Sequence, residues 1–302
     1  MGPMSAFPRL GELLPPEQGP TSWTHANPPT RPTAPGGPAW PSMTVITPSL
    51  NQGILIRETI ASVAGQRYPG LEHLVVDGGS TDGTLDVLRA CAGSVRWVSE
   101  ADAGQADAIN KGLDRTAGEI VAWLNADDLW APGAAAAAAG FLAAHPEVDV
   151  VYGDCIYLFQ DVPPEEARLV RARPFDLDTL LNVGCYVPQP ATFLRRAAIE
   201  GVRLDTGLRF ALDYDLWIRL ARAGRTFAYL PQTLAAFRVT CDSKSGRLLD
   251  EFWREVREVS LRNGGRAFSP MLLAHFKERA ARRWPRAWGV LKRLARRAPR
   301  GA

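Results

Sequence analysis

Between residues 43 and 124 the sequence alternates short apolar segments with segments of helical periodicity. The apolar segments, each long enough for one buried strand, are residues 43–47, 71–76, 95–98 and 119–124. The helical segments between them are residues 54–64, 85–91 and 106–115. Strands that alternate with helices usually pair in parallel, because each helix carries the chain back across the sheet. We therefore predict an α/β fold with a mostly parallel central sheet and helices on both faces.

The 302 residues divide into three segments by composition. Residues 1–41 are rich in Pro, Gly, Thr and Ser without periodicity, which predicts a disordered leader. The leader lacks the pattern of a secretory signal, and no stretch has the roughly twenty apolar residues of a membrane span. Residues 42–245 form the predicted folded domain, in which 148–152 continue the sheet, and 246–302 form a tail of helices. The four cysteines are widely spaced, which suits free thiols in a cytoplasmic protein.

Two adjacent acidic residues, Asp127 and Asp128, follow the strand predicted at 119–124. They would lie at the carboxyl end of a buried strand, facing the crevice where open α/β sheets bind ligands. Adjacent carboxylates repel each other, and a divalent cation held by oxygen ligands would compensate their charge. The alternative is structural, because an Asp close to Pro132 could cap the helix that begins there. This segment alone does not separate the two interpretations.

A glycine-rich turn, residues 77–84, follows the second predicted strand. Its glycines let the backbone approach a ligand, and Asp77 at the strand end can accept from a ribose hydroxyl or a base imide. The spacing matches neither the GxGxxG pattern of dinucleotide folds nor a GxxxxGK[ST] phosphate loop. The alternative is a structural turn in which Ser80 and Asp82 cap the next helix.

Several segments occur in an order that is typical of a known family. They are Thr-Pro-Ser-Leu-Asn at 47–51, the turn at 77–84, Ser-Glu-Ala-Asp-Ala-Gly-Gln-Ala-Asp-Ala-Ile-Asn-Lys-Gly at 99–112, Leu-Asn-Ala-Asp-Asp at 124–128, Gln-Pro-Ala-Thr-Phe at 189–193 and Leu-Asp-Tyr-Asp-Leu-Trp-Ile-Arg-Leu at 212–220. In this order they resemble the family 2 glycosyltransferases of the GT-A fold, over roughly residues 42–245. The resemblance implies a nucleotide-sugar-binding half at 42–150 and an acceptor half, with the catalytic base, at 151–245.

The resemblance also implies roles for individual residues of the donor half. The nucleoside pocket would be lined by Thr47, Pro48, Ser49 and Asn51. Asp77 matches the acid that contacts the base, and Asp102 would lie near the ribose. Asp127 matches the last acid of the family's Asp-X-Asp motif and would hold Mg²⁺ or Mn²⁺ on the donor diphosphate. Asp128 would orient the sugar.

In the acceptor half, Asp213 matches the family's catalytic base, and the resemblance implies a single displacement that inverts the anomeric centre. A sugar hydroxyl is a poor nucleophile, so a carboxylate within hydrogen-bond reach helps by taking its proton. A metal neutralises the leaving diphosphate. Asp213 and Asp215 point about 200° apart around a helix, so only one can face the acceptor, and we predict Asp213. The alternative is that Asp213 is a helix cap or a solvated charge.

Three positions depart from the family pattern. Asn125 replaces the first acid of the metal motif, which weakens the site or leaves most of the coordination to one carboxylate. Ala103 stands where many relatives have Lys. Thr240 stands where a His often occurs, and its side chain cannot take that role. We therefore predict that Arg238 and Lys244 supply positive charge for the leaving group.

Positive charge is concentrated in the tail, because residues 271–302 contain ten Lys and Arg but one acid, while the whole chain has a net charge of +3. Trp284 and Trp288 interleave with these basic residues. A basic amphipathic helix with Trp suits an anionic membrane surface, so we predict peripheral contact of 270–302 with the inner face of the cytoplasmic membrane. The alternative is a helix that packs on the catalytic domain with a solvated basic face. Nucleic-acid binding is not expected, since no stacking surface accompanies the charge.

Together these patterns predict a bacterial inverting glycosyltransferase of polysaccharide or cell-envelope biosynthesis. The donor would be a UDP- or dTDP-linked sugar, and the acceptor a hydroxyl of a glycan or lipid-linked glycan. A sugar nucleotidyltransferase of the same fold would need a basic Gly-rich loop near the first strand, which this sequence lacks. The other alternative is a catalytically degenerate module that binds a nucleotide sugar or a membrane partner. The departures at Asn125 and Thr240 favour the degenerate module. The presence of Asp127 and Asp213, which match the metal ligand and the base, favours the enzyme.

Overall fold

The computed structural model describes residues 40–159, 167–239 and 249–275. The predictions made for the leader, for Thr240 and Lys244, and for residues 276–302 of the tail lie outside these residues.

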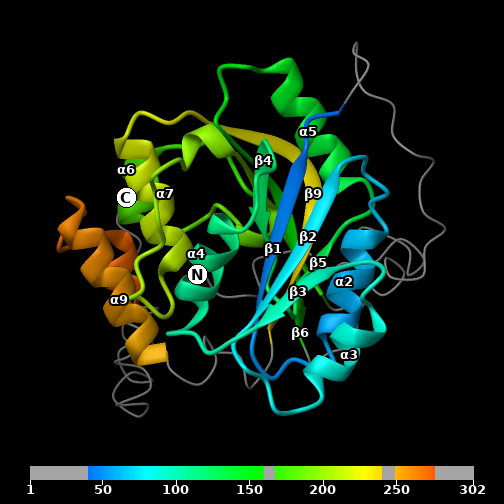
Figure 1. The fold of residues 1–302 in the computed structure, drawn as a ribbon. Helices are drawn as coiled ribbons and strands as arrows, with labels where there is room; N and C mark the ends of the chain where they lie inside the picture. Colours follow the sequence, from blue (N-terminus) through cyan, green and yellow to red (C-terminus); the bar gives the residue numbers. More distant parts are fainter. Residues whose placement is uncertain (1–39, 160–166, 240–248, 276–302) are drawn as a thin grey trace, which may run out of the picture.

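Residues 42–150, the predicted donor half, have the predicted alternation of strands and helices. Its strands are β1 (Met43–Ser49), β2 (Leu71–Asp77), β3 (Arg96–Ser99) and β4 (Ile120–Trp123). They pair in parallel in the order β3-β2-β1-β4, as Figure 1 shows. Its helices are α2 (Ile56–Ala64), α3 (Thr84–Ala90) and α4 (Gln105–Asp114). Each predicted boundary lies within two residues of the observed one.

The second half extends the same sheet with mixed pairing. Its strands are β5 (Leu129–Trp130), β6 (Val150–Phe159), β7 (Arg168–Val170), β8 (Thr192–Arg195) and β9 (Phe227–Val239). β8 runs antiparallel to both β4 and β6, whereas β9 is parallel to β6. The fold class is confirmed, with most of the parallel pairing in the first half. The strand predicted at 148–152 is the beginning of the longer β6.

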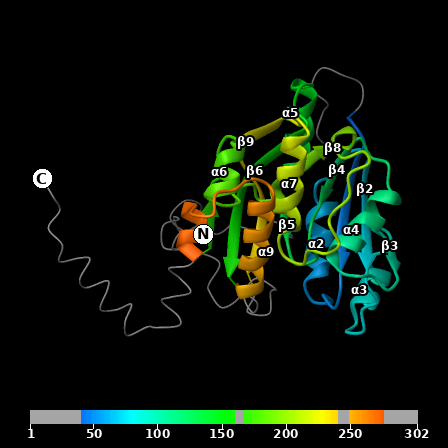
Figure 2. The same ribbon diagram turned by 90° about the vertical axis from the view of Figure 1, so that its left-hand side faces the viewer.

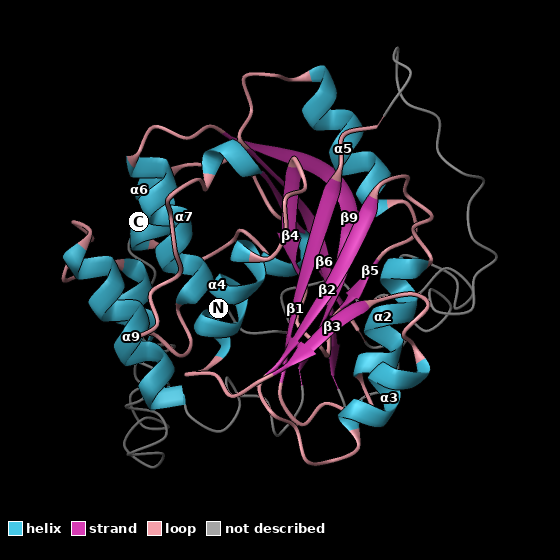
Figure 3. Cartoon of the chain, viewed as in Figure 1, coloured by secondary structure: helices cyan, strands magenta, loops and turns pink. Residues whose placement is uncertain are grey.

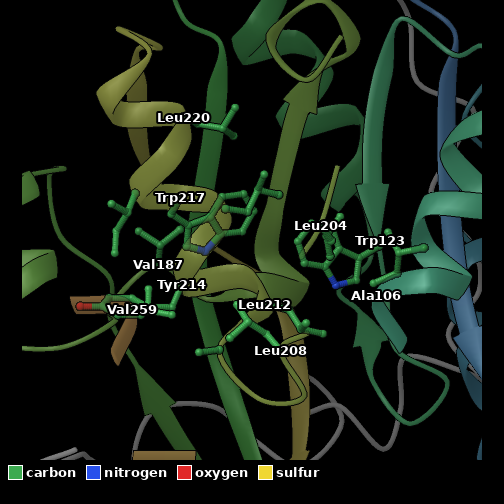
Figure 4. Close-up of a cluster of buried hydrophobic side chains, with 14 of the residues drawn as sticks. Ala106, Trp123, Val187, Leu204, Leu208, Leu212, Tyr214, Trp217, Leu220 and Val259 are labelled. Carbon is green, nitrogen blue, oxygen red and sulfur yellow. The ribbon is translucent and has the colours of Figure 1, made fainter. Parts of the chain in front are cut away.

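Helices cover both faces of the sheet (Figures 1 and 3). α2, α3 and the Ala-rich α5 (Ala134–Ala144) lie on one face. α4, α6 (Leu177–Asn182), α7 (Leu212–Arg222) and α9 (Leu249–Arg262) lie on the other. On this second face the indole rings of Trp123 and Trp217 stack at 5.5 Å, which joins the end of β4 to α7 (Figure 4).

The described part of the predicted tail packs against α7 (Figure 2). Trp253, Val256 and Val259 of α9 share a buried cluster with Leu212 and Leu216 of α7. Met271 and Leu272 are buried in the same cluster, so for these residues the packing alternative holds. Within the described ranges, no helix combines the length and apolarity needed to cross a bilayer.

Candidate active site

The loops after β1 and β2 are tied together at the carboxyl edge of the parallel strands. The backbone N–H of Asn51 donates to Ser80 Oγ at 2.7 Å, and Asn51 Oδ1 accepts from the N–H of Thr81 at 2.8 Å. Asn51 has a φ of 54°, a left-handed conformation that Asn tolerates better than most residues. Asn51, predicted to line the nucleoside pocket, therefore also fixes the shape of the loop that would form it.

The other three residues predicted for this pocket lie in β1 and are buried. Thr47 Oγ1 is hydrogen-bonded to His73 Nε2 at 2.8 Å, and burial lowers the pKa of His73 to about 3, so the ring is neutral. Pro48 is also buried. Ser49 is 5% exposed, and its hydroxyl has no hydrogen-bond partner in the structure. Since a buried unsatisfied hydroxyl is costly, Ser49 is the one of the three best suited to a polar ligand contact.

Asp77 is fully buried and holds the glycine-rich turn. Its Oδ2 accepts from the N–H groups of Gly79 and Ser80, at 3.1 and 2.9 Å, and from Ser99 Oγ at 2.7 Å. Its Oδ1 accepts from Ser80 Oγ at 2.5 Å. With these four donors the carboxylate has little capacity left, and the predicted contact of Asp77 with the base stays a prediction.

The structural alternative for this turn is correct in part. Asp82 Oδ1 accepts from the backbone N–H of Thr84, the first residue of α3, at 3.0 Å. Ser80 does not cap this helix, because its hydroxyl is bound to Asp77.

Asp102 lies directly over Gly78. A Cβ added at Gly78 would come within 2.5 Å of Asp102 Oδ2, so only glycine leaves room for the carboxylate in this position. Asp102 is partly exposed, and its Oδ1 accepts from the N–H of Gly104 at 2.8 Å. Of the two acids predicted to contact the nucleoside, Asp102 is therefore the one that remains accessible.

Asn125 is the centre of an amide network that the sequence did not reveal. Its Nδ2 donates to Asp128 Oδ2 at 3.1 Å and to Gln189 Oε1 at 3.2 Å, and its Oδ1 accepts from Gln105 Nε2 at 2.8 Å. Gln189 in turn donates to the carbonyl of Trp123 at 2.6 Å. An Asp at position 125 could not donate, so the departure from the family pattern provides Asp128 with a hydrogen-bond donor.

Asp128 is fully buried beneath this network. Its Oδ1 accepts from the backbone N–H of Arg238 at 3.0 Å. Burial and the charge of Asp127 raise the pKa of Asp128 well above its ordinary value. The helix-cap alternative is wrong, because the N-cap of α5 is Gly133, and the N–H of Ala135 in its first turn donates to Gln66 Oε1 at 3.2 Å. The sugar-orienting role of Asp128 stays a prediction.

Asp127 lies at the partly exposed end of this motif. Among the described residues, no three His, Cys, Asp or Glu side chains are grouped so that they could share a metal ion. Mg²⁺ usually keeps several waters and binds through one or two carboxylates together with substrate phosphates. The residues present therefore fit a cation that is held largely by the donor diphosphate, rather than one held in a cage of protein ligands.

The two acids at the start of α7 have different environments. Asp215 is 1% exposed and pairs with Arg219 Nε at 2.7 Å and Arg262 Nη2 at 2.5 Å. Asp213 is partly exposed, and no Lys, Arg or His of the described chain forms an ion pair with it. Burial raises the pKa of Asp213 to about 6. The geometry thus favours Asp213 over Asp215 as the carboxylate that can take a proton from a substrate.

Tyr157 of β6 was not predicted as a site residue. Burial raises the pKa of its phenol, and the charges of Cys155, Cys185, Asp213 and Asp128 raise it further. Its ring also packs against Phe237 at 5.2 Å between centroids.

Arg238 at the end of β9 reaches the start of α2. Its Nη2 pairs with Glu58, while its buried Nη1 has no hydrogen-bond partner in the structure. Because its backbone also binds Asp128, this cation lies close to the acidic motif, as its predicted role with the leaving group requires.

Comparisons with known proteins show which family this chain belongs to. The profile of "Glycosyl transferase family 2" matches residues 44–202, more than half of the 302 residues. A PGL/p-HBAD biosynthesis glycosyltransferase of Mycobacterium bovis (BCG) is 34% identical over 188 residues, which are 60% of this chain and 70% of the relative.

The chain belongs to glycosyl transferase family 2.

Other members and solved structures extend the likeness. This chain is 27% identical to the putative teichuronic acid biosynthesis glycosyltransferase TuaG of Bacillus subtilis. The match covers 72% of this chain and 88% of TuaG. The mannosyltransferase PcManGT of Pyrobaculum calidifontis, solved with GDP-Man and Mn²⁺, matches with a TM-score of 0.57 and 25% identity, over 94% of this chain and 81% of that one.

Staphylococcus aureus TarS 1–349 with UDP-GlcNAc matches with a TM-score of 0.58 at 19% identity, over 74% of this chain and 66% of that one, which shows the fold alone. A longer TarS chain also matches, and the match covers 80% of this chain and 43% of the TarS chain.

These findings confirm the predicted family, the GT-A fold and the enzyme class. The family 2 profile ends at residue 202, before Asp213, so the role of the base depends on the geometry of α7.

Proposed function

We propose that this family 2 enzyme transfers a sugar from a nucleoside diphosphate donor to a hydroxyl of a glycan or lipid-linked acceptor, with inversion at the anomeric carbon. Asp213 is the general base, and Asp127 binds Mg²⁺ or Mn²⁺. The observation that carries the proposal is the contrast on α7, where Asp215 is bound by two arginines while Asp213 is partly exposed with a pKa raised to about 6.

The proposed mechanism needs one base and one centre of positive charge. Asp213, ionised at neutral pH, accepts the proton of the acceptor hydroxyl as that oxygen attacks the anomeric carbon. A bound divalent cation would stabilise the negative charge on the departing diphosphate. Arg238 lies beside the acidic motif and adds a fixed positive charge. The hydrogen bond from Asn125 to the buried Asp128 keeps this motif in place next to Asp127.

On the donor side, Ser49 and Asp102 provide the polar contacts for the nucleoside, with Thr47, Pro48 and Asn51 forming the wall of the pocket and Asp77 its floor. UDP and dTDP are the proposed nucleotides. GDP must be included in any test, because the name of the PcManGT structure includes GDP-Man. The names of the relatives, which refer to teichuronic acid and PGL/p-HBAD biosynthesis, support an acceptor that is a bacterial cell-envelope glycan or glycolipid.

A thermal-shift panel tests the donor site. Wild type, Asp127→Ala and the exposed control Asp86→Ala are melted with UDP, GDP or dTDP, each with Mn²⁺ or EDTA. A ligand at a hundred times its dissociation constant stabilises the folded state by about 2.7 kcal/mol, which is easily measured. We expect one nucleotide to raise the melting temperature in Mn²⁺, with the shift lost in Asp127→Ala and kept in Asp86→Ala.

Turnover separates the enzyme from the degenerate alternative. Nucleotide release is measured with the corresponding sugar nucleotide and with octyl glycosides as acceptors, and the anomeric configuration of the product is read by NMR. Binding without turnover in every combination would favour the degenerate module, which Asn125 keeps as a candidate. A product that retains the donor configuration would contradict the single displacement.

We also propose that the basic segment 270–302 brings the enzyme to the inner face of the cytoplasmic membrane. Phe268, just before this segment, is 86% exposed, and Leu273 within it is 45% exposed. Sedimentation with phosphatidylglycerol vesicles, but not with phosphatidylcholine vesicles, is the expected result. Equal sedimentation with both, or with neither, would contradict an electrostatic contact.

A further inference from the structure

α7, the helix that carries Asp213, lacks a side-chain cap of its own. Its N-cap residue is Ala211, which cannot accept a hydrogen bond through its side chain. The first N–H groups of a helix have no partner within the helix, and leaving them unsatisfied in a buried place is costly. Within the first turn, the N–H of Tyr214 donates to Asp213 Oδ1 at 2.8 Å, whereas the N–H of the N-cap residue Ala211 is bound by a side chain from elsewhere in the chain.

Glu255 of α9 binds the N–H of Ala211 and those of the two residues before it. Its carboxylate is 6% exposed, and its Oε2 accepts from the backbone N–H groups of Arg209, Phe210 and Ala211 at 3.0, 2.8 and 3.1 Å. Its Oε1 accepts from Arg209 as well, at 3.0 Å. A single buried carboxylate thus holds the three residues that lead into α7, and its charge is favourable at the positive end of the helix.

A second residue of α9 holds the same segment. Arg262 donates to Asp215 Oδ1 at 2.5 Å and to Asp205 Oδ2 at 3.3 Å. The segment 205–215 is therefore attached to α9 at both ends, with Asp213 between the attachments. The apolar contacts of Trp253, Val256 and Val259 with the core around α7 keep the two helices together (Figure 2).

We infer that Glu255 is a positioning residue for the reaction, because it fixes the segment 209–211 from which α7 starts and with it the direction of the Asp213 carboxylate two residues later. This inference rests on the proposed role of Asp213 as the base. It gives α9, which lies outside the matched family profile, a function in catalysis.

The test compares Glu255→Ala with Glu255→Gln and with Glu258→Ala, an exposed residue of the same helix. Turnover is measured with UDP-glucose, UDP-N-acetylglucosamine, GDP-mannose and dTDP-rhamnose in Mn²⁺ with octyl glycosides, and nucleotide affinity with UDP, GDP and dTDP. We expect Glu255→Ala to lose about 10- to 100-fold in kcat with unchanged nucleotide affinity, since small misplacements of a catalytic group have effects of this size. Glu255→Gln should recover much of the rate, because its carbonyl oxygen can still accept from the N–H groups.

Amide hydrogen exchange provides a readout that does not depend on turnover. Residues 209–215 should exchange faster in Glu255→Ala than in wild type or Glu258→Ala, while 77–84 in the donor half should not change. If Glu255→Ala does not fold, Glu255→Asp, with its carboxylate one methylene shorter, takes its place with the same expected result.

The outcomes separate this inference from the proposed function. A folded Glu255→Ala or Glu255→Asp with wild-type kcat would overturn the positioning role and leave the glycosyltransferase proposal intact. An equal loss of kcat and nucleotide affinity would also overturn it, because it would indicate general disruption. If the wild-type protein shows no turnover, the proposed function is wrong. Amide exchange still tests Glu255 in that case, because unchanged exchange of residues 209–215 in the Glu255 variant would contradict its positioning role.

Discussion

The side-chain amide of Asn125 donates a hydrogen bond to the buried carboxylate of Asp128 over 3.1 Å. We therefore expect Asn125→Asp to be destabilising although it restores the acid that the family motif has at this position. The new carboxylate would replace a donor with a like charge beside Asp128, at an expected cost of about 1–3 kcal/mol in the free energy of unfolding. Urea denaturation in EDTA measures this cost, and Mn²⁺ with nucleotide should reduce it. Unchanged stability in EDTA would show that the hydrogen bond is unimportant.

Asp213→Asn should abolish transfer and yet stabilise the fold. Burial raises the folded-state pKa of Asp213 to about 6, so ionisation of this group opposes folding above that pH. The variant should gain on the order of 2 kcal/mol at pH 8, and the gain should disappear below about pH 4, where the acid is protonated in both states. Denaturation at the two pH values checks this, and Asp114→Asn on the exposed end of α4 is the control.

The wild-type rate should fall on the acidic side of about pH 6, because the base must be ionised to accept a proton. The logarithm of kcat should decrease with a slope of one as the pH is lowered, while nucleotide binding at pH 5.5 stays measurable. A rate that is constant from pH 7 to pH 4.5 would argue against Asp213 as the base.

The two acids predicted near the nucleoside should behave differently when truncated. Asp77→Ala leaves four donors without an acceptor, so we expect a loss on the order of 3 kcal/mol in stability. Asp102→Ala should change stability by less than about 1 kcal/mol but weaken nucleotide binding, because its carboxylate is partly exposed. Chemical denaturation and isothermal titration with UDP, GDP and dTDP separate the effects. If Asp77→Ala weakened nucleotide binding and Asp102→Ala did not, Asp77 would be the acid that contacts the nucleotide.

Gly78→Ala should weaken nucleotide binding through Asp102. The added Cβ would lie 2.5 Å from Asp102 Oδ2, so the carboxylate must move. In the background of Asp102→Ala the same substitution should have little further effect, since the atom that it displaces is gone. Nucleotide affinity of the two single variants and the double variant gives this coupling, and strict additivity would exclude it.

Glu58→Gln should strengthen nucleotide binding if Arg238 interacts with the diphosphate. Glu58 now pairs with the guanidinium of Arg238, and a diphosphate would have to compete for it. Removing the competing charge should raise affinity about two- to fivefold, the range expected for a partly exposed ion pair. Glu72→Gln, which breaks the pair with Arg96 on β3, is the control and should have no effect. Unchanged affinity in Glu58→Gln would leave Arg238 without a role in binding.

The donor half was predictable because its signals are local. Strand and helix boundaries at 43–124 follow from apolar periodicity, and parallel pairing follows from their alternation. The ordered motifs indicated the family, which the comparisons confirm. Helix geometry predicted that only one of Asp213 and Asp215 can face the acceptor, and the family resemblance selected Asp213. The two arginines on Asp215 agree with that choice, which stays a prediction.

The mixed pairing of the second half was not predictable in the same way. β9 lies beside β6 although some seventy residues separate them in the sequence, and such long-range pairing leaves little local signal. The role of Asp77 was likewise hidden, since the sequence shows an acid at a strand end but not the four donors that surround it.

The sequence by itself determined the strand–helix alternation, the family and the identity of the acidic residues, because these depend on periodicity and on residue type at fixed spacing. Only the tertiary structure decided which acids are buried and which are accessible. It placed Asn125 on Asp128, Asp102 over Gly78 and Glu255 at the start of α7, contacts between residues 3, 24 and 44 to 46 positions apart. The physical reason is that burial and hydrogen-bond partners, which set the charge and direction of a carboxylate, are properties of the packed chain and not of the segment that carries the residue.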